Sequence, residues 1–130
     1  LQTADGMGNT PPSRQDLYMG TSFPHPALFP RTRAVIHHGG AGTTATAARS
    51  GVPQIIVPHI LDQYFWAKRI HHCGLSPTPI WRDRLDARRL HQAMEVCLRD
   101  RLMAANAVEM KRRLEGEAPL LAATRAVEGV

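Results

Sequence analysis

The chain has 130 residues, enough for one globular domain with a moderate core but too few for a self-contained two-domain enzyme. Hydrophobic residues make up 43% and charged residues 21%, close to the globular average, which excludes a disordered or fibrous chain. Sixteen Lys and Arg against eleven Asp and Glu give a net charge of +5, spread thinly along the chain. This charge favours phosphate-bearing ligands of any kind and does not indicate nucleic acid.

The two cysteines, Cys73 and Cys97, show no CxxC spacing, which favours neither a disulfide framework nor a zinc knuckle. No apolar run approaches the roughly 20 residues that cross a bilayer, and the first residues lack the features of a secretory signal. We therefore expect a cytoplasmic protein, at most peripheral to a membrane. Because the chain does not begin with Met, we also expect it to be a piece of a longer protein.

The first half of the chain predicts a strand, a helix and a second strand. Turn-forming residues dominate positions 1–30, where only residues 17–19 have the composition of a short strand. The apolar run 34–36 predicts a strand, and the glycine-rich turn after it leads into a helix over residues 43–49. The apolar run 55–57 lies a helix-length further on, which predicts a parallel partner for the first strand.

The second half predicts mainly helices. One begins at Asp62, a typical N-cap residue, and ends at Gly74. Its apolar face is expected at Phe65, Trp66, Ile70 and Cys73. Residues 75–80 are too rich in proline for a central strand and suit an edge or a loop. The chain is then helical from Asp83 onward.

Two further apolar faces are expected on those later helices. They comprise Leu85, Leu90, Met94 and Leu98 on one and Leu102, Val108, Met110 and Leu114 on the other, before a final segment from Pro119. Strands that alternate with helices, followed by helices alone, predict an α/β fold: a Rossmann-like parallel sheet flanked by helices, with a helical C-terminal segment.

Ligands of open parallel sheets bind beyond the carboxyl ends of the strands, so the residues after the two apolar runs are the candidates. After the first run comes a glycine turn over residues 39–42, followed by Thr43. Glycines let backbone N–H groups approach an anion, and the following helix directs its positive end to the same place. The turn is therefore a candidate phosphate site. The alternative is that its glycines serve only tight packing.

His37 and His38 end the first strand, where a histidine can donate to a phosphate or act as acid or base. Adjacent strand residues point to opposite faces, so the two are poorly placed to share a metal ion, and one of them is expected only to pack. His71 and His72 also lack a Cys or carboxylate partner at ligand spacing. We expect no metal site.

Asp62 and Gln63 follow the second run, and their side chains can accept from and donate to vicinal hydroxyls. The alternative is that Asp62 serves only as the N-cap, and the two roles are compatible. A cluster of arginines, interleaved with Asp83 and Asp86, indicates a solvated helix face and not a nucleic-acid surface. Its members are Arg82, Arg84, Arg88 and Arg89.

Together these motifs resemble the donor-binding, C-terminal domain of GT-B-fold UDP-glycosyltransferases. The resemblance is carried by AVIHHGGAGTT at residues 34–44, GVP at 51–53, VP at 57–58, DQ at 62–63 and WA at 66–67. Residues 24–30 and 74–80 make the sterol 3β-glucosyltransferase branch and bacterial natural-product glycosyltransferases the most similar members. The likeness covers about residues 17–98.

The resemblance implies a role for each matching residue. His38, Gly40, Ala41, Gly42 and Thr43 would hold the donor diphosphate, Asp62 and Gln63 hydroxyls of the transferred sugar, and Pro24 and His25 would lie near the nucleotide base. Thr46 stands where plant members carry a Glu for the ribose, which leaves the donor as a UDP-sugar or a dTDP-sugar. No cofactor or metal is implied.

The implied reaction is transfer of a hexose, glucose by resemblance, to a hydroxyl of a lipid, sterol or natural-product acceptor. In this family the catalytic base and the acceptor pocket belong to an N-terminal domain. Residues 1–130 are therefore expected to form a partial donor-binding domain that lacks catalytic residues, lacks the acceptor domain and is inactive alone. Two alternatives remain: a stand-alone nucleotide-sugar-binding subunit of a two-chain transferase, and a non-catalytic nucleotide-binding module.

Overall fold

The structure is a computed structural model and describes residues 17–116. The N-terminal half comprises α1 (His25–Leu28), the 3-10 turn η1 (Phe29–Arg31), β1 (Val35–His37), α2 (Ala41–Ser50) and β2 (Gln54–Ile56). The C-terminal half comprises α3 (Gln63–His72), the 3-10 turn η2 (Arg82–Arg84), α4 (Ala87–Arg99) and α5 (Arg101–Gly116). This order confirms the α/β class. The final segment expected from Pro119 lies outside the described residues.

The two strands pair in parallel, with Val35 opposite Gln54 and His37 opposite Ile56, which confirms the strand–helix–strand prediction. The outer edge of β2 is covered by the proline-rich segment 75–80: Gln54 N donates to Leu75 O (2.9 Å) and Ile80 N donates to Ile56 O (3.1 Å). That segment is a loop, as expected. The strand expected at residues 17–19 is wrong, because these residues have no regular structure and only Gly20 forms an isolated bridge.

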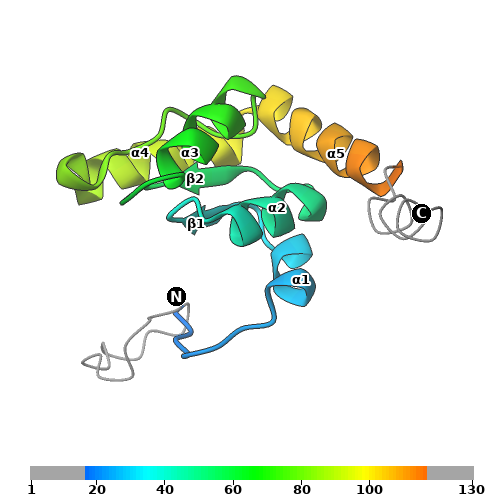
Figure 1. Cartoon of the computed structure of the whole chain (residues 1–130), viewed down its shortest axis with the longest axis horizontal. Helices are drawn as coiled ribbons and strands as arrows, with labels where there is room; N and C mark the ends of the chain where they lie inside the picture. The colour runs from blue at the N-terminus through cyan, green and yellow to red at the C-terminus, as the bar shows by residue number, and fades with distance from the viewer. Residues whose placement is uncertain (1–16, 117–130) are drawn as a thin grey trace, which may run out of the picture.

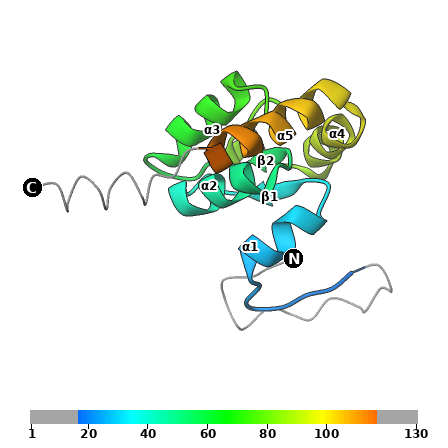
Figure 2. The same ribbon diagram turned by 90° about the vertical axis from the view of Figure 1, so that its right-hand side faces the viewer.

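Helices pack on both faces of this small sheet (Figures 1 and 2). On one face, Ile55 and Val57 pack with Ala93 and Cys97 of α4. On the other face, Ile56 packs with α3 and α5 through a cluster that includes Ala67, Ile70 and Ala107. The short α1 lies below α2 in both views. The core is therefore three-layered, with the strands in the middle.

The apolar faces expected on the long helices are confirmed only in part. Ile70 is buried, and Cys73, Leu90 and Met110 pack against the core, but other members of these faces lie at the surface. Phe65 on α3 is 60% exposed, and Met94, Leu98, Leu102 and Val108 on α4 and α5 are exposed as well. The buried face is made instead of Ala93, Cys97, Met103 and Ala107. Small side chains let a helix approach its neighbour closely. Where Gly51, just after α2, faces α5, an added Cβ would lie 3.0 Å from Lys111 and 3.7 Å from the Ala107 carbonyl oxygen.

Helix ends follow the expected chemistry in several places. Gly51 (φ +72°) and Gly74 (φ +73°) adopt the left-handed conformation just after α2 and α3, which glycine reaches at least cost. Asp86 caps α4 by accepting from Arg89 N (2.7 Å), so the helix begins at Ala87 and not at Asp83. The arginine cluster is exposed, which confirms a solvated face.

The different burial of two neighbouring residues on α5 leads to a prediction about stability. Met103 is 7% exposed and packs in the core, whereas its neighbour Leu102 is 71% exposed. We expect Met103→Ala to lower the free energy of unfolding by about 2–5 kcal/mol, because it removes buried volume that the core cannot fully refill. Leu102→Ala is the matched control and should change it by no more than about 0.5 kcal/mol. Urea unfolding of both variants measures this; equal effects would contradict the burial assignment.

Candidate functional site

Two turns meet at the carboxyl end of the sheet. One connects β1 to α2 through residues 38–40, and the other connects β2 to α3 through residues 57–62. Because β1 and β2 are parallel, both turns emerge at the same edge. In open α/β sheets this edge is where ligands bind, so the candidate residues from both turns are considered together.

His37, the last residue of β1, is held on two sides by hydrogen bonds. Its Nδ1 accepts from Gly39 N (3.0 Å), and its Nε2 lies 2.6 Å from Gln54 Oε1. Since a backbone N–H can only donate, the proton of the neutral ring is on Nε2, which donates to Gln54. The pKa of His37 is lowered to about 4, chiefly by burial and to a smaller extent by nearby His38 and His25, while the hydrogen bond to Gln54 acts in the opposite direction. His37 is therefore the histidine that packs, and it is neutral at pH 7.

The residues expected to bind the diphosphate gather at the N-terminus of α2. The helix begins at Ala41, earlier than expected, and Gly40 is its N-cap residue. The first N–H groups of a helix have no intrahelical acceptor, and no acidic residue in this first turn competes for them. His38 is exposed. Its ring lies against Gly40, because a Cβ added to Gly40 would be only 2.8 Å from His38 Nε2. The arrangement suits an anion.

Asp62 does not act as the helix cap expected from the sequence. It occupies the N-cap position of α3, but its backbone is helical (φ −68°, ψ −14°) and its side chain makes no capping hydrogen bond. A capping residue needs an extended backbone for its side chain to reach back to the first N–H groups, which explains the failure. The exposed carboxylate is thereby left available to a ligand hydroxyl.

Gln63 orders the turn that precedes it. Its Oε1 accepts from His59 N (2.8 Å) and from Ile60 N (3.0 Å). The amide NH₂ is the remaining polar group of the side chain and can donate to a sugar hydroxyl. In the same turn, Leu61 has a φ of +50° and is exposed, so the backbone between β2 and α3 is tightly bent.

Gly39 brings the two turns into contact. Its φ of +92° favours glycine, and a Cβ there would lie 2.9 Å from Ile56 Cγ2 and 3.1 Å from the Gln63 backbone oxygen. No larger residue fits without moving one turn away from the other. The candidate diphosphate turn (residues 38–40) therefore packs directly against the two residues that flank the candidate sugar turn (residues 57–62).

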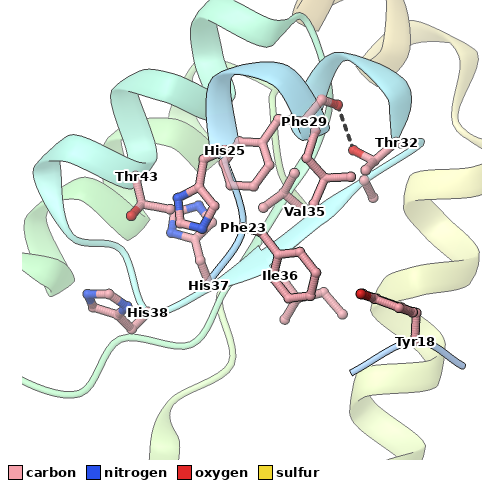
Figure 3. A pocket seen from close by; sticks show the side chains of 12 residues that line it. Tyr18, Phe23, His25, Phe29, Thr32, Val35, Ile36, His37, His38 and Thr43 are labelled. Atoms are coloured by element: carbon pink, nitrogen blue, oxygen red, sulfur yellow. Dashed lines mark hydrogen bonds between the residues drawn. The ribbon is translucent and has the colours of Figure 1, made fainter. Parts of the chain in front are cut away.

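A cavity of about 680 Å³ adjoins the first turn (Figure 3). It is lined by residues of α1, β1 and the start of α2, among them Phe23, His25, His38 and Thr43. His25 stacks on Phe29, with ring centroids 4.6 Å apart and planes 15° apart. The cavity thus brings together His25, which is expected near the nucleotide base, and His38 and Thr43, which are expected at the diphosphate. Pro24, Asp62 and Gln63 are not among the described residues that line it.

Three further residues complete the description of the site. Gln54 is fully buried (0% exposed) and its Nε2 donates to Thr44 O (3.4 Å), a role that sequence reasoning missed. The sequence did contain a signal for this role: Gln54 directly precedes the apolar run 55–57, and an amide buried there needs hydrogen-bond partners. Thr46 donates to Gly42 O (2.9 Å) within its own helix. The buried Thr44 hydroxyl has no hydrogen-bond partner within residues 17–116.

Residues 17–116 show neither a metal-binding cluster nor a membrane-spanning helix. No group of three or more His, Cys, Asp or Glu side chains there is arranged to hold a metal ion. None of the helices in that part of the chain combines the length and the apolar character that crossing a bilayer requires.

Comparison with known families identifies the domain. Residues 5–120 match the sequence profile of the erythromycin biosynthesis protein CIII-like C-terminal domain. The chain belongs to this family. It is 40% identical over 100 residues to a sterol 3-beta-glucosyltransferase of Arabidopsis thaliana, covering 77% of this chain and 16% of that protein. It is 46% identical over 101 residues to O-mycaminosyltylonolide 6-deoxyallosyltransferase of Streptomyces fradiae, covering 78% of this chain and 22% of that protein.

Solved structures of similar proteins support the same fold. The glycosyltransferase of kitacinnamycin superposes with a TM-score of 0.89 over 98% of this chain and 33% of its own, at 20% identity. The glycosyltransferase VinC, solved in complex with dTDP, superposes with a TM-score of 0.71 over 76% of this chain and 25% of its own, at 29% identity. The EryCIII-like domain described here thus spans only a fraction of the length of these relatives. Both resemblances recognised in the sequence, to sterol glucosyltransferases and to bacterial natural-product enzymes, are confirmed.

The depressed pKa of His37 makes stability depend on pH. Unfolding returns the ring to a pKa near 6.5, so the unfolded chain binds a proton that the folded chain excludes until about pH 4. We expect the free energy of unfolding to be highest above pH 6.5 and to fall by up to roughly 3 kcal/mol as the pH drops to 4. The difference between the parent chain and His37→Asn, measured by urea unfolding across this window, isolates the effect. A constant difference would contradict a neutral, half-buried His37.

Proposed function

We propose that this chain is the donor-binding part of a glycosyltransferase, able to bind a nucleoside diphosphate sugar. The observation that carries the proposal is the packing of two ligand-binding turns at one sheet edge through Gly39. One turn offers free helix N–H groups and an exposed histidine, which suit a diphosphate. The other offers an uncapped carboxylate and an amide, which suit vicinal hydroxyls. A diphosphate linked to a sugar requires groups that bind an anion and groups that bind hydroxyls to lie side by side.

Each predicted residue receives a role in this proposal. His38 donates to a diphosphate oxygen, and the N–H groups of residues 41–43 at the positive end of α2 stabilise the same charge. Asp62 and Gln63 bind sugar hydroxyls. His25, preceded by Pro24, lies beside the cavity and contacts the nucleotide base, while Phe23 gives that cavity an aromatic wall. UDP and dTDP differ only in the base and the ribose, so the diphosphate contacts serve either donor.

For the full enzyme we propose transfer of a hexose, with glucose as the first candidate, to a hydroxyl of a lipid, sterol or natural product. Support comes from the relatives, which include sterol 3-beta-glucosyltransferases and a deoxyallosyltransferase. We assign donor binding to residues 1–130, as a partial donor domain that needs no metal ion. The catalytic base and the acceptor pocket are assigned to an N-terminal acceptor domain, with the enzyme in the cytoplasm or at the periphery of a membrane.

Titration calorimetry tests the diphosphate assignment. His38→Ala should weaken binding of UDP and dTDP by roughly 10- to 100-fold, because hydrogen bonds to charged groups are worth about 1.5–3 kcal/mol. His91→Ala, an exposed histidine on α4, is the matched control and should bind like the parent chain. Unchanged binding in His38→Ala would refute the assignment, and a parent chain that binds neither nucleotide would refute donor binding as a whole.

A second comparison separates sugar from nucleotide. Asp62→Ala should leave the affinity for UDP unchanged and remove the difference in affinity between UDP-glucose and UDP, since only the sugar reaches this carboxylate. Asp83→Ala, exposed in η2, is the control. Equal losses for UDP and UDP-glucose in Asp62→Ala would show that the residue supports the turn and does not bind the sugar.

A further inference from the structure

We propose that His37 and Gln54 form a positioning pair that holds the diphosphate turn and the sugar turn at a set spacing. This inference rests on the proposed function, because it assigns the pair to the donor site described above. Neither residue is given a direct role in catalysis. Their effect on the donor is exerted through Gly39.

The first step is the direction of the hydrogen bonds. Gln54 donates from Nε2 to Thr44 O, so its Oε1 faces His37 and accepts from Nε2 of the ring. The opposite ring nitrogen accepts from Gly39 N. One continuous chain of hydrogen bonds therefore runs from α2 through β2 and β1 to the glycine turn. It leaves the ring a single tautomer.

The second step is what Gly39 contacts. Its left-handed backbone lies against Ile56 of β2 and the Gln63 backbone oxygen at the start of α3, with no room for a Cβ. A displacement of Gly39 therefore shifts the first residue of α3 as well as the N-terminus of α2. By fixing the Gly39 N–H, His37 sets both ends of the ligand site at once.

The third step is the charge state that the pair requires. A protonated ring would carry a hydrogen on Nδ1 pointing at the Gly39 N–H, and the bond would become a repulsion. Burial opposes that protonation, as do the two titratable groups that act on the ring, His25 from α1 and His38 from the turn itself. The network works only with a neutral His37, so His37 is unsuited to donate to phosphate. His38 is left for that task.

The ring can be tested without any ligand. In the ¹⁵N-labelled chain, the His37 nitrogens should show a protonated Nε2 and an unprotonated Nδ1 throughout pH 5–8. Because donor binding plays no part in this measurement, it stands whether or not the chain binds UDP. A ring that titrates in this range, or that carries its proton on Nδ1, would overturn the proposal.

Variants then connect the pair to the donor. His37→Leu leaves the Gly39 N–H without its acceptor and should weaken UDP binding roughly tenfold. His37→Asn should restore most of that loss, since an Asn side-chain oxygen can accept from the N–H two residues on. Thermal unfolding of both variants identifies any that fails to fold. A folded His37→Leu with parent-like UDP affinity would overturn the proposal.

Gln54→Glu gives a readout that a purely structural role would not move. A carboxylate beside Nε2 favours the protonated ring, so the UDP affinity of this variant relative to the parent should fall as the pH drops from 8 to 6. Taking the ratio cancels the titration of UDP, which is common to both measurements. Gln92→Glu, exposed on α4, is the matched control and should show a constant ratio. A constant ratio for Gln54→Glu would also count against the proposal.

Discussion

The parallel pairing of β1 with β2 is the constraint on which the rest of this domain depends. Three residues on each strand fix the register, and that register places the ends of both strands at one edge. The chain then leaves each strand through a turn, and the two turns contact each other at Gly39. An antiparallel pair would send them to opposite ends of the sheet. The proposed donor site thus depends on strand direction before it depends on any side chain.

Much of this arrangement could be predicted from the sequence because it depends on local signals. Short apolar runs separated by a glycine turn and a helix-length segment specify a strand–helix–strand unit, and Gly51 and Gly74 mark helix ends through their left-handed backbones. The candidate diphosphate residues follow from the same pattern, since they are contiguous. The candidate sugar turn lies beside them because of the packing around Gly39, which no local signal reveals.

The failures share a cause, which is that tertiary packing decided between two local possibilities. The sequence offers α4 and α5 large apolar residues such as Met94 and Leu102, yet small ones such as Ala93 and Ala107 face the core. Close approach to the sheet and to α2 favours the small face. Asp62 likewise has the right residue type for a cap, but the bend at Leu61 brings its backbone into helical geometry too early. Periodicity alone cannot distinguish these outcomes.

The glycines of the first turn differ in whether the surrounding protein explains the absence of a side chain. Gly39 is required by the fold, and Gly40 borders the His38 ring. Gly42 is different: apart from its two chain neighbours and the backbone of its own helix, no atom of the described residues lies within 4 Å of where its Cβ would be. Glycine in a helix costs about 0.5–1 kcal/mol relative to alanine, and the protein around it offers no steric reason for that cost. If a side chain at position 42 reduced ligand binding without reducing stability, the effect would therefore report a close contact with the ligand itself and not with the protein.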